Sequence, residues 1–178
     1  MTVLGWGEIV HPHLTRYHRF GLWLTKSVPG VYVFRYVWTP LDILVLRLTQ
    51  GHRSLAPRAV PEVWLTTIGR KTQRTHSTAV LYLRDGDRYV VVGSNYGRGR
   101  HPAWAHNLRA NGTATIQIGS HQQEVISRSA TPEEVERYWP RLLEVWPGGA
   151  TYRWMTDREF WMFVLEPRPQ VSPLARSE

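Results

Sequence analysis

Two kinds of hydrophobic spacing divide the chain. In its first third, residues 14–25 are rich in aromatic and basic side chains, and residues 41–48 are mostly aliphatic. Thr39 and Pro40 offer a helix N-cap followed by proline at the first helical position. The pattern therefore predicts a helical N-terminal extension over residues 1–60.

Beyond that extension the chain changes to short runs of β-branched and aromatic residues, which are typical of strands. The turn signal Asp85-Gly86-Asp87 separates two of these runs and predicts a tight hairpin. The strands are expected at 63–67, 77–84, 88–94, 113–118, 122–129 and 160–165.

Two helices are expected among these strands. One should cover residues 102–110 and end at Asn111-Gly112. The other begins at Thr131-Pro132-Glu133-Glu134, a capping box with proline at the first helical position. Because the strands outnumber the helices and follow one another as hairpins, we expect an α+β domain over 61–168. It should be an antiparallel barrel or sheet with peripheral helices, followed by a flexible tail at 169–178.

The composition excludes several classes of protein. The chain has no cysteine, which rules out disulfides, thiolate catalysis and Cys-ligated zinc. No stretch approaches the roughly 20 apolar residues that a membrane span needs. No secretory signal opens the chain either. We therefore expect a cytoplasmic protein.

The net charge of +8 is unevenly distributed. Residues 1–62 carry seven basic and three acidic side chains, and residues 63–113 carry eight basic side chains against two acidic ones. Residues 114–178 carry seven against nine, which leaves −2 there. The excess predicts an anionic partner for the front and middle of the chain, and nucleic acid, acidic lipid and a phosphate-bearing cofactor all satisfy it.

A basic turn follows the first expected strand. Residues 66–74 contain a glycine, several hydroxyl residues and the cations Arg70, Lys71 and Arg74. Such a turn can point several backbone N–H groups in one direction and form an anion site. The spacing of a P-loop is missing. The alternative interpretation is a solvated hairpin turn that is merely basic.

A second candidate ligand-binding segment covers residues 93–108. Gly93, Ser94 and Asn95 are small, so the backbone there can approach a ligand closely. The helix that follows offers free N–H groups for an anion. Trp104 and Asn107 lie three residues apart on it and can share a face. Alternatively, the tryptophan belongs to the core and the asparagine is a cap or turn residue.

Other catalytic patterns are missing. His101 and His106 lie five residues apart, not the four that would place two imidazoles on one helix face, and we predict no metal site. No nucleophile elbow, metalloprotease motif or dinucleotide fingerprint is present. An enzyme with this sequence would therefore take its chemistry from a cofactor.

A series of motifs runs in order from residue 63 to residue 167: L-T-T-x-G-R-K-T, L-Y-L-R-D-G-D-R-Y-V-V-V, G-S-N-x-G, H-P-x-W-x-x-N-L-x-A-N, W-P-G-G-A-T-Y, T-D-R and F-V-L-E-P. In this order the motifs resemble the deazaflavin-dependent nitroreductase family of actinobacteria. The resemblance implies a split β-barrel related to the flavin-binding pyridoxamine-phosphate-oxidase-like folds, which often dimerise. It also implies coenzyme F420, an 8-hydroxy-5-deazaflavin whose tail carries a phosphodiester and glutamates, with FMN less expected.

The resemblance also implies roles for single residues. The phosphate and nearby carboxylates would be held by Arg70, Lys71 and Thr72. The deazaflavin ring would be lined by Val92, Gly93, Ser94 and Asn95, and the groove closed by Ala103, Trp104 and Asn107.

The chain departs from the family pattern at two places. His76 replaces an expected tail-binding arginine, for which Arg74 can compensate. Of three tyrosines that family members can carry, only Tyr152 survives; the other aligned positions are Trp146 and Gly149. On this resemblance Ser94 and Tyr152 are the candidate catalytic residues, and Trp146 is a further cofactor contact.

The implied function is hydride transfer from reduced F420 to a small organic acceptor such as a quinone, a nitroaromatic or an activated alkene. The aromatic, basic segment 14–38 can also lie on the anionic inner face of the cell membrane, or simply pack on the barrel. The alternative function is a non-catalytic barrel that binds F420, a fatty acyl chain or haem. Nucleic acid is disfavoured as a partner because the basic residues cluster in turns and no reading helix is present.

Overall fold

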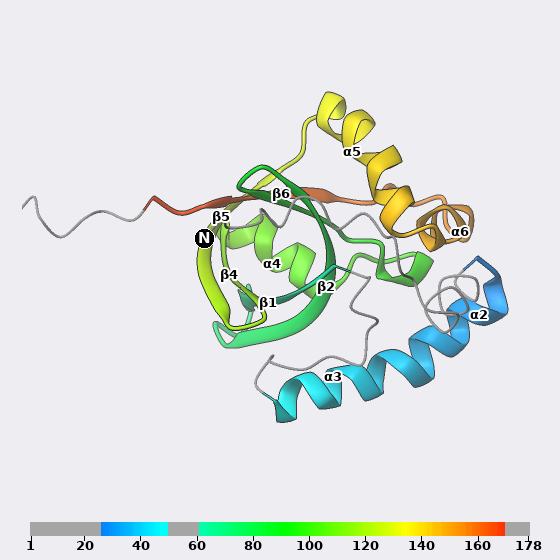
Figure 1. Ribbon diagram of the computed structural model, residues 1–178, viewed down its shortest axis with the longest axis horizontal. Helices are drawn as coiled ribbons and strands as arrows, with labels where there is room; N and C mark the ends of the chain where they lie inside the picture. The colour runs from blue at the N-terminus through cyan, green and yellow to red at the C-terminus, as the bar shows by residue number, and fades with distance from the viewer. Residues whose placement is uncertain (1–25, 50–60, 170–178) are drawn as a thin grey trace, which may run out of the picture.

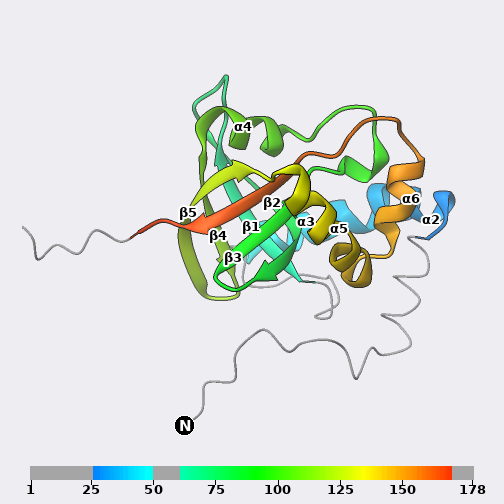
Figure 2. The same cartoon turned by 90° about the horizontal axis from the view of Figure 1, so that it is seen from above.

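A computed structural model describes residues 26–49 and 61–169, so the expectations for residues 14–25 and for the C-terminal tail lie outside the described residues. Six antiparallel strands close into a barrel (Figures 1 and 2). The expected antiparallel barrel with peripheral helices is therefore confirmed. The strands are β1 (Glu62–Ile68), β2 (Thr75–Asp85), β3 (Arg88–Val92), β4 (Thr113–Ile118), β5 (His121–Ser129) and β6 (Met162–Pro167).

The strand order around the barrel is β1-β2-β3-β6-β5-β4, and β4 pairs with β1 to close it. The predicted hairpin joins β2 to β3, with Asp85 opposite Arg88. Gly86 stands at its tip with φ +66°, a left-handed conformation that glycine adopts without strain. The tight turn fixes the register, and the register decides which side chains point into the barrel.

Apolar side chains form two cores, one on each side of the barrel wall. Val91 on β3 and Phe163 and Leu165 on β6 belong to the core inside the barrel. The neighbouring Val90 and Val164 belong to the second core, under the helix α5. Because both faces of β3 and β6 are covered, these strands are continuously apolar rather than alternating.

The helices lie outside the barrel wall or across its end. Figures 1 and 2 show α4 across one end of the barrel, and α5 and α6 together on one side. The helical elements are α2 (Val28–Val33), η1 (Phe34–Trp38), α3 (Thr39–Leu48), η2 (Asn95–Gly97), α4 (Ala103–Asn111), α5 (Pro132–Val145) and α6 (Gly148–Trp154). Among the described residues, no helix is both long and apolar enough to cross a membrane.

The expectation that Thr39 caps the start of a helix is wrong. The backbone of Trp38 and Thr39 is helical, and α3 continues from α2 through the π-helical turn η1. The wider π-turn accommodates Pro40, which has no N–H to donate. The Thr39 hydroxyl instead donates to the Phe34 carbonyl oxygen (2.9 Å) and shares a hydrogen bond with the Tyr96 hydroxyl (2.8 Å).

The predicted capping box of α5 is confirmed. The Thr131 hydroxyl accepts from the Glu134 N–H (3.3 Å), and the Glu134 carboxylate accepts from the Thr131 N–H (2.9 Å). The helix ends at Val145, and a second short helix, α6, begins at Gly148. A Cβ on Gly149 would lie 2.8 Å from the Trp146 ring, so the close approach of α5 and α6 requires glycine there.

Candidate functional site

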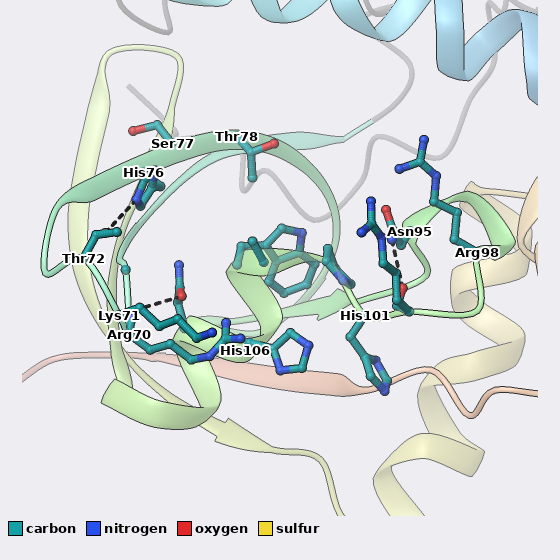
Figure 3. A pocket seen from close by; sticks show the side chains of 16 residues that line it. Arg70, Lys71, Thr72, His76, Ser77, Thr78, Asn95, Arg98, His101 and His106 are labelled. Carbon is teal, nitrogen blue, oxygen red and sulfur yellow. Dashed lines mark hydrogen bonds between the residues drawn. The ribbon is translucent and has the colours of Figure 1, made fainter.

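A cavity of about 710 Å³ opens where three segments meet: the β1–β2 turn, the loop after β3 and the first turns of α4. Figure 3 shows Arg70, Lys71 and Thr72 on one side of it and Asn95 and Arg98 on the other. We call this cavity the groove. It is lined by Gly69, Arg70, Lys71, Thr72, His76, Ser77, Thr78, Asn95, Arg98, Arg100, His101, Pro102, Ala103, Trp104, His106 and Asn107.

The basic turn is tied to α4 by one asparagine. The Asn107 Oδ1 atom accepts from the backbone N–H of Arg70 (3.1 Å), and its Nδ2 atom donates to the Thr67 hydroxyl (3.1 Å). Asn107 is 4% exposed and Thr67 is 1% exposed. Because water cannot replace these bonds, the asparagine holds the turn that carries two cations in a fixed place against the helix.

The turn itself is tightly packed. The Gly69 N–H donates to the Arg74 carbonyl (2.8 Å), and the Gln73 N–H donates back to the Gly69 carbonyl (2.8 Å). A Cβ on Gly69 would lie 2.5 Å from the Thr72 hydroxyl oxygen, so a side chain there would displace neighbours. The same hydroxyl lies 3.2 Å from the His76 Nε2 atom. Because Gly69 has no side chain, the Thr72 hydroxyl and the His76 imidazole can contact each other beside it.

The charge of the groove has one sign. Its lining includes Arg70, Lys71, Arg98 and Arg100, and no aspartate or glutamate. The Arg98 Nε atom is buried and has no hydrogen-bond partner among the described residues. A buried, unsatisfied donor costs free energy until a partner arrives. This donor set therefore suits an anionic ligand that also accepts hydrogen bonds.

Two histidines in the lining are held neutral. His101 stacks on Trp161, with ring centroids 3.5 Å apart and planes 13° apart. Burial, followed by the nearby Arg158 charge, lowers the pKa of His101 to about 4. Burial, followed by the charges of Arg70 and Arg109, also lowers the pKa of His106. Near neutral pH both rings are therefore uncharged hydrogen-bonding groups in a cationic groove.

Most residues expected at a cofactor site lie in this lining. They are Arg70, Lys71, Thr72, His76, Asn95, Ala103, Trp104 and Asn107. Trp104 also packs against the core inside the barrel, as the alternative interpretation expected. Its contact with a cofactor stays a prediction.

Three expected ring contacts lie at the end of β3, just before the lining residue Asn95. Val92 is buried, and a Cβ on Gly93 would lie 3.4 Å from Ala105 and Pro102. Ser94 is half-buried, and its backbone carbonyl accepts a hydrogen bond from Arg158 (2.8 Å). Their contact with a ligand stays a prediction.

Trp146 and Tyr152 belong to a separate aromatic cluster around α6. Their ring centroids are 5.0 Å apart, and Tyr152 also lies 5.8 Å from the Tyr96 ring. Tyr152 is 3% exposed, and burial raises its pKa. Neither residue lines the groove, so the roles expected for both stay predictions.

Sequence reasoning missed part of the lining: Gly69, Ser77, Thr78, Arg98, Arg100, His101, Pro102 and His106. The sequence spacing of the two histidines only excludes a metal pair. In the structure their ring centroids lie 5.8 Å apart, and both rings contact Trp161. The run Gly97-Arg98-Gly99-Arg100 was a usable signal for the two arginines, because alternating glycine and arginine in a loop can expose cations to a ligand.

Comparison with known proteins agrees with this geometry. A family model described as F420H(2)-dependent quinone reductase matches residues 41–167. The F420H(2)-dependent quinone reductase of Mycobacterium tuberculosis H37Rv is 38% identical over 122 residues, which cover 66% of this chain and 76% of the relative. A putative F420H(2)-dependent quinone reductase of the same strain is 31% identical over 123 residues, covering 69% of this chain and all of the relative.

Solved structures agree as well. One described as an F420-H2-dependent reductase is 31% identical, covers 60% of this chain and 94% of its own, and has a TM-score of 0.55. Another, described as a domain-swapped dimer, is 28% identical, covers 71% and 99%, and has a TM-score of 0.58. The expected resemblance, the reductase class and coenzyme F420 as cofactor are therefore confirmed. By the family match over most of its length, the chain belongs to the F420H(2)-dependent quinone reductase family.

Proposed function

We propose that the protein binds reduced F420 in the groove and transfers its hydride to an electron-poor organic acceptor, with a quinone as the first candidate. The observation that carries the proposal is the groove itself: four cations and an aromatic ring, Trp104, without a carboxylate in the lining. Quinones come first because the family and the relatives are named for them. Nitroaromatics and activated alkenes share the same electron demand and belong in the same assay.

The groove residues fit a coenzyme with a polyanionic tail. Arg70 and Lys71 stand next to each other on a turn whose backbone is fixed by Asn107. Guanidinium and ammonium groups bind phosphate and carboxylate oxygens through charge-assisted hydrogen bonds. The cavity of about 710 Å³ leaves room for the ligand, and the unsatisfied Arg98 Nε atom offers a further donor. Donor type, charge and space all agree with the ligand.

The two sides of the groove would bind different parts of the coenzyme. Arg70, Lys71 and Thr72 would hold the tail phosphate and the nearest carboxylates, with His76 beside them. When bound, the reduced coenzyme supplies the hydride. The protein's contribution is to fix the ring face against the acceptor and to exclude alternative orientations.

The ring side of the groove is assigned to the segment 92–95 and to α4. Val92, Gly93, Ser94 and Asn95 would line the deazaflavin ring, and Ala103, Trp104 and Asn107 would close over it. Support comes from the position of Asn95, Ala103, Trp104 and Asn107 in the lining. It also comes from the small side chains that precede Asn95, which permit close approach of a flat ring.

Charge develops on the acceptor during the reaction. Addition of a hydride to a quinone carbon leaves a negative charge on an oxygen, which one proton then neutralises. The groove cations would stabilise that oxyanion, and the Ser94 hydroxyl would donate a hydrogen bond to the acceptor or the ring. Of the two roles expected for Tyr152, packing is the better supported, because burial raises its pKa and makes it a poorer proton donor. Water entering the groove would supply the proton.

The test combines binding and turnover. Purified protein is titrated with F420, with FMN as the comparison ligand, and reduced F420 is then oxidised in the presence of menadione, a nitroaromatic or an activated alkene. We expect micromolar or tighter F420 binding and turnover with menadione. The double variant Arg70→Ala, Lys71→Ala should bind F420 at least about tenfold more weakly. Tight F420 binding without oxidation by any acceptor would contradict the reductase proposal.

We further propose that the N-terminal helices contact an anionic membrane surface, where a lipid quinone would be within reach. The described part of the expected segment 14–38 continues into α3, and the run from α2 to α3 exposes large apolar side chains at three- and four-residue spacing. Arg35 and Arg47 add positive charge to this run, and Lys26 lies just before it. The exposed apolar residues are Tyr32, Val33, Tyr36, Val37, Leu41, Leu44 and Leu48.

Vesicle sedimentation tests this contact. We expect the protein to sediment with phosphatidylglycerol vesicles and less with phosphatidylcholine vesicles. The double variant Leu41→Ser, Leu44→Ser should lose most of that binding, whereas Ile126→Ser, an exposed apolar residue on β5, serves as the matched control. Equal sedimentation of all three proteins, or no effect of deleting residues 1–38, would end the membrane proposal.

A homodimer is the remaining partner proposal. It is supported by the related structure described as a domain-swapped dimer. Light scattering behind size-exclusion chromatography measures the mass directly. A mass of one chain at every concentration used would contradict it.

A further inference from the structure

One arginine outside the groove lining, Arg158, holds the loop that forms one wall of the groove. It lies between α6 and β6 and donates to three points along that loop. Its Nη2 atom donates to the Ser94 carbonyl (2.8 Å), its Nε atom to the Arg98 carbonyl (3.1 Å), and its Nη1 atom lies 2.8 Å from the His101 Nδ1 atom. The beginning, middle and end of the loop 94–101 are therefore tied to a single guanidinium.

The hydrogen-bond partners of Arg158 are backbone carbonyls and an imidazole. Within the described part of the chain, Arg158 forms no ion pair with a carboxylate. Its remaining bond is to the neighbouring Glu159 carbonyl (3.0 Å), and its guanidinium lies over the Phe160 ring at 4.8 Å. Its hydrogen-bonding capacity thus goes to backbone carbonyls and an imidazole. A rigid, planar fork of five N–H donors suits such a multi-point contact, and a lysine ammonium does not.

The bond to His101 decides the form of that ring. Because a guanidinium can only donate, the His101 Nδ1 atom must accept, and the neutral imidazole then carries its proton on Nε2. The ring face is fixed against Trp161 by stacking. His101 also lines the groove. The same contact that fixes the loop therefore leaves a neutral N–H donor on a residue of the groove lining.

We propose that Arg158 is a positioning residue for the groove: it fixes the loop 94–101 as a preformed wall and fixes His101 as the Nε2–H tautomer, a neutral donor for an oxygen of the bound ligand. The inference rests on the proposed function only for the identity of that ligand. Preformed walls raise affinity because less loop ordering is needed on binding.

The decisive variant is Arg158→Lys, which keeps the charge and loses the fork. Arg153→Lys on α6, an exposed arginine, is the matched control. Three measurements are made on each: F420 affinity by fluorescence titration, hydrogen exchange of the backbone amides of 94–101, and the nitrogen-15 spectrum of the His101 ring, assigned by its loss in His101→Gln.

We expect Arg158→Lys to weaken F420 binding about tenfold and to accelerate exchange in the loop but not in the barrel strands. The His101 spectrum should show a mixture of tautomers and a pKa that rises toward its ordinary value. Unchanged affinity with an unchanged His101 spectrum would overturn the proposal. So would lower thermal stability without any change in loop exchange or in the ring, because Arg158 would then be only a structural brace.

A second pair of variants does not depend on the folding of Arg158→Lys. His101→Gln loses the stacking on Trp161 but keeps one acceptor for Arg158 and one donor for the groove, so it should bind F420 more tightly than a variant that lacks both. His101→Phe keeps the stacking and loses both, and it should bind about tenfold more weakly. Equal affinity of the two variants would overturn the role of His101. If the wild type does not bind F420, the proposed function fails, while exchange and ring spectra still test the positioning role.

Discussion

Asn107 connects the two halves of the groove through a single buried amide. It accepts from the Arg70 N–H and donates to the Thr67 hydroxyl, both at 3.1 Å. Asn107→Ala would leave two buried partners unsatisfied, so we expect the free energy of unfolding to fall by about 2–4 kcal/mol. F420 affinity should also fall, because the turn that carries Arg70 and Lys71 is released. Chemical denaturation and fluorescence titration measure the two effects.

The control for this prediction lies one helical turn further along α4. Asn111 also donates to the β1–β2 region, through its Nδ2 atom to the Ile68 carbonyl (2.7 Å), but it is exposed. Since water can replace that bond, Asn111→Ala should cost less than about 1 kcal/mol. If both substitutions cost the same, burial is not what makes Asn107 important.

His101 should make stability depend on pH. Its pKa is lowered to about 4, first by burial and then by Arg158, so the unfolded chain binds its proton more readily than the native state does. The stabilisation is therefore complete above about pH 6.5 and is lost as the pH falls from there toward 4. His101→Gln cannot titrate and should flatten this part of the curve. Urea denaturation at pH 4, 5, 6 and 7 gives the comparison, and parallel curves for variant and wild type would contradict it.

The residue scale also shows the limit of inference from sequence. The cations Arg70 and Lys71 are adjacent in the chain and follow a strand, so their joint role was predictable from local pattern alone. Arg158 meets His101 across 57 residues, and no periodicity links them. A contact of that kind forms only when β3 and β6 pair in the closed barrel, and no local sequence pattern predicts that pairing.

At the scale of elements, α5 is the helix that covers the outer face of β3 and β6. Leu142 is fully buried in the core it forms there with Val90 and Val164. Leu142→Ala should lower the free energy of unfolding by about 2–5 kcal/mol, because it removes buried surface and leaves a cavity. Glu144→Ala on the exposed face of the same helix should change it by less than about 0.5 kcal/mol. Thermal or urea unfolding measures both, and equal effects would contradict the packing role of α5.

The elements that were predictable have strong local signals. The β2–β3 hairpin has its turn residues, and α5 has its capping box. The elements that were missed depend on individual side-chain contacts instead. The η1 turn is accompanied by the bond from Thr39 to Tyr96, and α6 begins where Gly149 packs on the Trp146 ring. Since neither contact leaves a periodic pattern, local sequence reasoning finds only the ends of these segments.

At the scale of the whole molecule, the uneven charge predicts salt-dependent binding. The chain carries +8, and the groove adds fixed cations without a carboxylate in its lining. An anionic tail is therefore attracted both by the local pairs and by the wider field, and exposed charges are screened beyond about 8–10 Å at ordinary ionic strength. F420 affinity should fall steadily as sodium chloride is raised from 50 to 500 mM. In Arg70→Ala, Lys71→Ala the decline should be shallower, whereas Arg153→Ala, an exposed cation on α6, should keep the wild-type slope. An affinity that is independent of salt in the wild type would mean that ring contacts, and not the cations, hold the coenzyme.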